Sequence, residues 1–322
     1  MTRVCRPLTY PVGGRRGYRC AAFGKTPEES VMNKPVITQA MIDAYDEYTH
    51  LTLDRRRFME RLTALAGSAA AAATIAPMLA ANSAKAEMVA ATDERLKGEN
   101  ITYPGADGEM KGYLVRPANS PEKLPAVIVI HENRGLNPHI KDVARRVALD
   151  GFVALAPDFL SPDGGTPSDE DKAREMIGAL DAGETNANAV ATVTFLKGHA
   201  ESTGNVGAIG FCWGGGMVNR LAVNSPDLKA GVAYYGSQPK AEDVPKIKAA
   251  MLLHYAGLDE RINAGIEAYR NALKENGKDA TIHIYDGVNH AFNNDTSAAR
   301  YDKAAADLAW GRTIEFLKTK LA

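Results

Sequence analysis

The chain has 322 residues, of which 45% are hydrophobic and 24% are charged, and its formal net charge is −1. A charge this close to zero gives no electrostatic reason to expect binding to nucleic acid or to an anionic membrane surface. Length and composition together indicate a globular protein with one large domain or two small ones.

An export signal is predicted near the N-terminus. Residues 54–60 contain three consecutive arginines followed by Phe58, and an apolar, alanine-rich stretch extends over 62–81. The next residues, 82–86, offer small side chains at the −3 and −1 positions of a cleavage site. This succession is typical of a signal peptide, and the arginines resemble a bacterial twin-arginine signal. A retained membrane anchor or a buried helix is the alternative, but the stretch is weakly hydrophobic for a permanent span.

A leader of doubtful structure, residues 1–53, precedes this signal. Residues 1–31 show no periodicity, and Met32 offers an alternative translation start. Removal of residues 1–86 leaves 322 − 86 = 236 residues, 87–322, which suit a single domain. The mature protein is then expected in the periplasm or outside the cell, delivered by the export machinery and free of the membrane after cleavage.

The cysteines point to one special thiol. Cys5 and Cys20 belong to the leader, so Cys212 is the single cysteine of the mature chain and has no partner for an intramolecular disulfide. A free thiol in an oxidising compartment is either buried in a core or has a chemical role.

Strand and helix patterns alternate through residues 87–322. The turn at 105–108, followed by 110–116, is typical of a hairpin at a sheet edge. Continuous apolar runs predict strands at 126–130, 152–156, 206–211, 230–235, 250–255 and 281–285. Helices are expected at 140–149, 170–180, 186–197, 215–223, 262–275 and 298–320. This alternation predicts an α/β fold with a doubly wound, mostly parallel sheet, whose ligands bind beyond the carboxyl ends of the strands.

The predicted strand 206–211 leads directly into a glycine-rich turn. The pattern Gly210-x-Cys212-x-Gly214 is a nucleophile elbow with cysteine in place of serine. Glycine is needed on both sides because larger side chains would collide at this sharp turn, and the following helix N-terminus favours the thiolate. The alternatives are a structural cysteine beside a helix start and a dinucleotide-binding loop, but the G-x-G-x-x-G spacing is absent.

Two residues further along the chain complete a catalytic triad. Asp259 follows the strand 250–255 and His290 follows the strand 281–285, which is the order nucleophile, acid, base found on α/β-hydrolase folds. We expect His290 to exchange the thiol proton and Asp259 to fix its orientation. The other histidines of residues 87–322 fit the base role less well; they are His131, His139, His199, His254 and His283.

These motifs resemble the dienelactone hydrolase (carboxymethylenebutenolidase) family over residues 95–320. The triad intervals, 259 − 212 = 47 and 290 − 259 = 31, fit this family. The stretches that carry the resemblance are 129–132 (VIHE), 156–158 (APD), 210–216 (GFCWGGG), 234–236 (YYG) and 290–292 (HAF). The resemblance implies an α/β-hydrolase fold and hydrolysis of an ester or lactone through an acyl-cysteine.

The resemblance also implies a partner for the resting thiol and an oxyanion hole. Family members pair the thiol with a glutamate after the third strand, which is Glu132 here, although a surface-facing glutamate is the alternative. The backbone N–H groups of Asn133 and Trp213 would form the oxyanion hole. His131 and Glu132 do not form a zinc motif, since position 135 is glycine.

The chain departs from the family where a substrate carboxylate would bind. Two arginines that hold this carboxylate are replaced in this chain by residues of the stretches 159–163 and 293–294. Arg134 is a candidate replacement, and the other candidate pocket residues are Tyr234, Tyr235 and Phe292. We therefore expect activity on small esters or lactones without selectivity for the carboxylated dienelactone.

Other functions for the same residues stay open at this stage. The triad would also suit a thioesterase or an acyltransferase, and Cys212 alone would suit a redox-sensing or ligand-binding protein, although the mature chain has no resolving cysteine. No metal or organic cofactor is expected, the partner is a small-molecule substrate, and a monomer is the default.

Overall fold

The computed structural model describes residues 35–80 and 87–322. The chain divides into two units, Met1–Val36 and Ile37–Ala322, and the elements below belong to the second unit. The expectations that concern Cys5, Cys20, the start at Met32 and the cleavage site at 82–86 lie outside the described residues.

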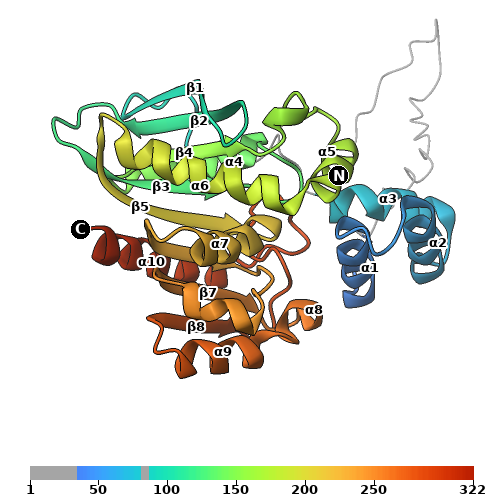
Figure 1. Ribbon diagram of the computed structural model, residues 1–322. Coiled ribbons are helices and arrows are strands. Elements are labelled where there is room, and N and C mark those ends of the chain that lie inside the picture. Colours follow the sequence, from blue (N-terminus) through green and yellow to red (C-terminus); the bar gives the residue numbers. More distant parts are fainter. Residues whose placement is uncertain (1–34, 81–86) are drawn as a thin grey trace, which may run out of the picture. The chain divides into compact units, whose positions relative to one another are not determined.

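Three helices come first in the described part of the chain, and residues 39–79, which contain them, are called the N-terminal segment. The helices are α1 (Gln39–Thr49), α2 (Arg55–Ala66) and α3 (Ala69–Leu79) (Figure 1). The side chains of Asp54 and Ser68 cap α2 and α3 by accepting backbone N–H bonds. Apolar side chains of all three helices share a small core: Met41, Ile42, Ala44, Tyr45, Tyr48, Phe58, Leu62, Ala72, Ile75 and Leu79.

Parts of this segment coincide with the predicted leader and export signal. Among the described residues, no single helix is long and apolar enough to cross a membrane, whereas α2 and α3 satisfy length and composition only as a pair bent by 112°. In this structure the described part of the leader is helical at α1, and the apolar side chains of α2 and α3 pack against it.

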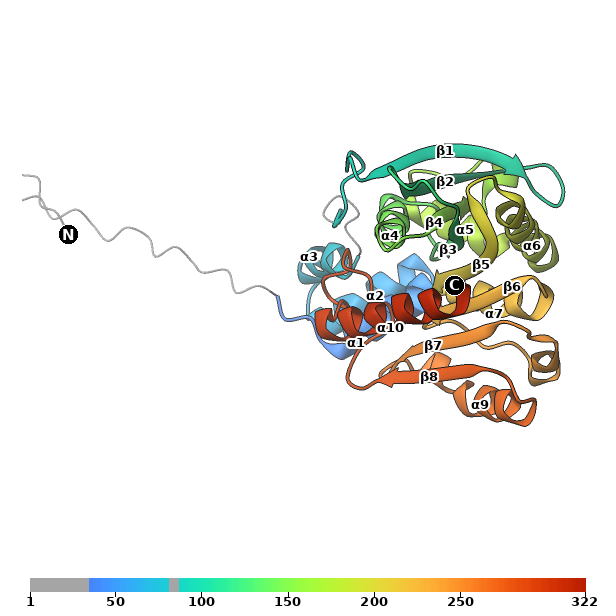
Figure 2. The ribbon, with the colours of Figure 1, turned by 90° about the vertical axis from the view of Figure 1, so that its left-hand side faces the viewer.

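An eight-stranded sheet is the centre of the remaining structure (Figure 2). Its strands lie in the order β1-β2-β4-β3-β5-β6-β7-β8; only the pairs that involve β1 and β2 are antiparallel. The strand bounds are β1 (Leu96–Pro104), β2 (Glu109–Pro117), β3 (Leu124–Ile130), β4 (Val153–Asp158), β5 (Ser202–Phe211), β6 (Leu228–Tyr234), β7 (Ala250–Ala256) and β8 (Ala280–Tyr285). The expected hairpin and the mostly parallel sheet are confirmed.

Helices cover both faces of the sheet, as expected for a doubly wound fold. Side chains of α6, α7 and α9 pack into one apolar core, and those of α4 and α10 pack into the other. The helix bounds are α4 (Pro138–Leu149), α5 (Glu170–Ala179), α6 (Ala182–Gly198), α7 (Trp213–Asn224), α8 (Glu260–Asn263), α9 (Ile266–Glu275) and α10 (Lys303–Leu321), with 3-10 turns η2 (Ser161–Asp163) and η3 (Ala241–Lys246).

One expected helix is divided and one starts later than expected. The single helix expected at 262–275 is two helices, because Asp259 caps the short α8 and a new helix starts after Gly265. The last helix begins at Lys303 rather than at residue 298, because Asp302 supplies its N-terminal cap.

Candidate active site

The turn after β5 has the geometry of a nucleophile elbow. Cys212 has φ 55° and ψ −115°, a conformation that non-glycine residues rarely adopt, and its backbone N–H donates to the Tyr234 carbonyl at 3.0 Å. A Cβ atom on Gly210 would lie 2.2 Å from the Gly214 carbonyl oxygen. A Cβ atom on Gly214 would lie 2.5 Å from the carbonyl oxygens of Ile130 and His131. The two flanking glycines are therefore required by close backbone packing.

Asp259 and His290 are joined directly. His290 Nδ1 lies 2.5 Å from Asp259 Oδ2, and both residues are 5% exposed. The other carboxylate oxygen, Oδ1, accepts from the Ile262 N–H at 3.2 Å and so caps α8. Asp259 is thus held by the helix it caps, and in turn it orients the imidazole ring.

The second ring nitrogen of His290 is free to meet the thiol. A ring nitrogen of His290 lies within 4.8 Å of Cys212 Sγ, and no hydrogen-bond partner for His290 Nε2 is found among the described residues. Burial lowers the pKa of His290, but the carboxylates of Asp46 and Asp259 and the thiolate hold it well above its usual value. The structure therefore brings together the three residues expected to form the triad.

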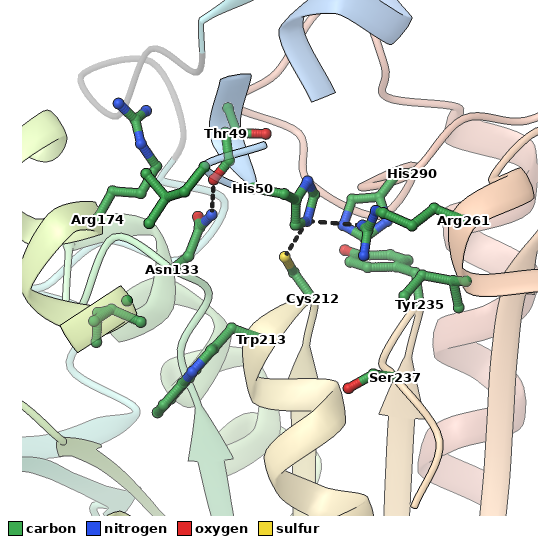
Figure 3. A pocket seen from close by; sticks show the side chains of 14 residues that line it. Thr49, His50, Asn133, Arg174, Cys212, Trp213, Tyr235, Ser237, Arg261 and His290 are labelled. Atoms are coloured by element: carbon green, nitrogen blue, oxygen red, sulfur yellow. Dashed lines mark hydrogen bonds between the residues drawn. The ribbon is translucent and has the colours of Figure 1, made fainter. Parts of the chain in front are cut away.

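A second histidine, His50, contacts the same sulfur atom from the N-terminal segment (Figure 3). His50 Nε2 lies 3.3 Å from Cys212 Sγ, and His50 Nδ1 lies 2.8 Å from the carbonyl oxygen of Asp46. Arg261 Nη2 also approaches His50 Nε2, at 2.9 Å. Sequence reasoning misses His50 because it assigns residues 1–53 to a leader outside the catalytic domain. The available signal was the helical spacing of Met41, Tyr45 and Tyr48, which places an amphipathic helix upstream of the arginines.

The two histidines lower the pKa of the Cys212 thiol. Burial raises this pKa, but the positive charges of His50 and then His290 outweigh it, and the result is a pKa of about 6. For His50, burial lowers the pKa, and the thiolate and the Asp46 side chain raise it to about 9. At neutral pH these directions favour a thiolate next to a protonated imidazole.

Glu132 does not have the partner expected for it. Its Oε2 accepts from Asn294 Nδ2 at 2.8 Å, and no hydrogen bond joins Glu132 to Cys212 among the described residues. A buried carboxylate requires a polar partner, which the Asn294 amide provides, while His50 lies beside the thiol. The expected pairing of Glu132 with the thiol is therefore absent from this structure.

A cavity of about 190 Å³ lies next to Cys212. Asn133 and Trp213, whose backbone N–H groups were expected to form the oxyanion hole, both line it. The other lining residues are Thr49, His50, Leu51, Arg174, Ile177, Gly178, Tyr235, Ser237, Arg261, Ile262 and His290. Its volume is below the roughly 300–1,000 Å³ of pockets for drug-sized ligands, and it suits a small ligand.

Of the four candidate pocket residues, only Tyr235 lines this cavity. Arg134 is buried beside it, where its guanidinium donates to Tyr45 Oη at 2.6 Å and lies 3.4 Å from Glu170. Tyr234 is fully buried and bonds to Thr313, and Phe292 is also fully buried. Arg134, Tyr234 and Phe292 were expected to line the pocket, and that expectation is wrong in this structure. Arg134 is buried in an ion-paired position, and the two aromatic side chains are buried in the packed core.

A cysteine on a strand-to-helix elbow, with an aspartate after β7 and a histidine after β8, defines an α/β-hydrolase with a thiol in its candidate active site. The comparisons narrow this class. Residues 110–321 match the family model described as "Dienelactone hydrolase family", and the chain belongs to that family. It is a hydrolase of the type that acts on carboxylic ester or lactone bonds.

Individual relatives agree with this assignment. A protein of Escherichia coli O157:H7 named "Putative carboxymethylenebutenolidase" is 32% identical over 254 residues, which cover 74% of this chain and 93% of that protein. The crystal structure of a "Putative Dienelactone Hydrolase" from Klebsiella pneumoniae is 28% identical with a TM-score of 0.64. It is matched over 98% of its length by 69% of this chain, so about three tenths of this chain has no counterpart there.

Proposed function

We propose that this protein hydrolyses small esters or lactones through an acyl-cysteine intermediate on Cys212. The observation that carries the proposal is the convergence of Cys212, His290 and Asp259 beside a small cavity. The low pKa of the thiol, about 6, supports a nucleophile that is already ionised at neutral pH.

The proposed reaction has two halves. The Cys212 thiolate attacks the ester carbonyl carbon, and the backbone N–H groups of Asn133 and Trp213 stabilise the oxyanion that forms. The C–O bond breaks, the alcohol leaves with a proton from His290 Nε2, and a thioester remains on the sulfur. Water then attacks the thioester while His290 accepts its proton, and the carboxylic acid is released with regeneration of the thiolate.

The cavity supports a small substrate without a carboxylate. In the full chain Arg134 does not serve as a carboxylate clamp, since its guanidinium is engaged by Glu170 and by Tyr45, which the cleavage proposed below would remove. Arg174 lines the cavity, but its guanidinium donates to Asp171 at 3.0 Å and stacks on the Tyr48 ring. With Arg134 and Arg174 engaged in the full chain, and with Arg261 of the cavity lining directed at His50, a neutral ester is favoured over an anionic one.

The test is hydrolysis of p-nitrophenyl acetate by the full chain, compared with the variants Cys212→Ala and His290→Ala. Both variants should lose turnover while the circular dichroism spectrum stays unchanged. Undiminished hydrolysis in either folded variant would contradict the triad. A neutral lactone tested beside a carboxylated one should show a higher kcat/KM for the neutral compound.

We also propose that residues 54–86 act as an export signal of the twin-arginine type and that the protein works in the periplasm or outside the cell. The three arginines and the apolar stretch after them support this proposal. Sequencing the N-terminus of protein recovered from the periplasm tests it. A mature N-terminus near residue 87 is expected, and full-length protein that remains in the cytoplasm would contradict it.

A further inference from the structure

The N-terminal segment presents a histidine–aspartate pair that mirrors the triad pair. His290 has its Nδ1 on Asp259, and His50 has its Nδ1 on the Asp46 carbonyl oxygen at 2.8 Å and near the Asp46 carboxylate at 3.4 Å. His50 Nε2 lies 3.3 Å from Cys212 Sγ, and a ring nitrogen of His290 lies within 4.8 Å of the same atom. The two rings meet edge to face, with centroids 4.8 Å apart. One thiol is therefore held between two imidazoles that are each backed by an aspartate.

The position of His50 is fixed by contacts on both sides of it. Before it, Tyr45 Oη accepts from the buried Arg134, and the Thr49 carbonyl oxygen accepts from Asn133 Nδ2. After it, Leu51 packs against Gly178, where a Cβ atom would lie 2.5 Å from Leu51 Cδ1. These contacts place residues 49–51 in the wall of the cavity, as Figure 3 shows for Thr49 and His50.

Backbone strain supports a functional role for this wall. Four non-glycine residues have positive φ within the described part of the chain: Leu51, Cys212, Tyr235 and Ala291. Cys212 is the nucleophile, Ala291 follows His290, and Tyr235 packs against the His290 ring at 4.8 Å. Leu51 follows His50 in the same way. Such conformations cost about 1–3 kcal/mol each and gather where a site requires a fixed geometry.

We propose that His50 is a positioning residue that holds the Cys212 thiolate as an ion pair, in the place that Glu132 was expected to take. This inference rests on the proposed function only in treating Cys212 as the reactive group. It makes the N-terminal segment a part of the active site for as long as the segment is attached. Glu132 instead bonds to Asn294, which leaves the thiol to the two histidines.

The charges around His50 and Cys212 have opposing effects on the protonation of His50. Asp46 and Asp259 stabilise protonated histidines, whereas Arg261 competes for His50 Nε2, since a guanidinium only donates and needs an unprotonated ring nitrogen there. Arg261 is 41% exposed in its side chain and can turn to water when His50 is protonated. The remaining groups that face the pair are His290, Arg300, Arg174, Tyr235 and Glu132.

The test measures alkylation of Cys212 by iodoacetamide against pH, in the full chain without substrate. His50→Gln should move the midpoint of alkylation upward from about 6, because a positive charge that favours the thiolate is lost. A shift of one unit makes alkylation about tenfold slower at pH ~5 and leaves it no slower at pH ~9. The control is Arg56→Ala, on the exposed side of α2, which should not shift the midpoint.

The outcomes separate the roles of His50. An unchanged midpoint in the folded His50→Gln protein would overturn the proposal. A rate that changes by the same factor at every pH would also overturn it, since His50 would then only shield the thiol. The alkylation assay uses no ester. If the unmodified chain does not hydrolyse esters while His50→Gln still shifts the alkylation midpoint, the proposed function is contradicted and this inference stands.

Discussion

Asp259 binds His290 through one carboxylate oxygen and caps helix α8 through the other. An amide can replace the second role but not the first. Asp259→Asn keeps an acceptor for the Ile262 N–H, and asparagine caps helices as well as aspartate does. If its amide N–H₂ faces His290 Nδ1, the proton is forced onto Nε2, which can then no longer act as a base.

Asp259→Asn should therefore lower kcat by roughly 10³–10⁴-fold with little change in stability. The control is Asp259→Ala, which should lose the activity and in addition about 1 kcal/mol of stability through loss of the cap. The measurements are p-nitrophenyl acetate turnover and urea unfolding. Retention of more than about a tenth of the kcat by Asp259→Asn would show that the aspartate does not set the histidine tautomer.

Gly214→Ala should destabilise the fold by at least about 2 kcal/mol, because its Cβ would meet the backbone of Ile130 and His131 at 2.5 Å. The matched control is Gly198→Ala at the end of α6, where no atom lies within 4 Å of the added Cβ. That variant should be neutral or more stable by about 0.4–1 kcal/mol. Equal free energies of unfolding for the two variants would mean that the elbow can relax.

The pH profile of kcat/KM should report the ionisation of the thiol. Burial raises the pKa of Cys212, but His50 and His290 lower it to about 6, so the thiolate is populated from that pH upward. The rate should rise through pH ~6 and level off near neutrality. A rise that continues to pH ~9, the usual range of a cysteine, would show that the histidines do not hold the thiolate.

Tyr45→Phe should destabilise the full chain by about 1–3 kcal/mol. The change removes the hydroxyl that accepts from Arg134, which is 5% exposed and also lies 3.4 Å from Glu170. Thermal unfolding of the variant beside Arg56→Ala, an exposed change on the same segment, measures the effect. No difference between the two would mean that the N-terminal segment contributes little at this contact.

Most of the catalytic domain could be predicted from the sequence because its signals are local. Apolar runs such as 126–130 predict buried strands, and Gly210 and Gly214 can be interpreted without tertiary information, since the elbow requires glycine at both places. Chain order then selects Asp259 and His290 among the acids and histidines that follow.

The rest depends on contacts between distant parts of the chain. Glu132 was expected to meet the thiol, but the amide of Asn294, 162 residues away in sequence, takes its carboxylate. His50 carries no motif, and its role depends on the docking of α1 beside Cys212. Arg134 was likewise expected to bind substrate, but its guanidinium donates to Tyr45, 89 residues away in the sequence.

The proposed mechanism requires an acyl-enzyme on Cys212, and this species can be trapped. The full chain is mixed with p-nitrophenyl acetate, quenched in acid and digested, and the peptides are analysed by mass spectrometry. The predicted result is one acetyl group on the peptide containing Cys212, absent in Cys212→Ala, which also lacks turnover. Hydrolysis without acetylation of this peptide, or with equal rates in Cys212→Ala, would contradict the mechanism.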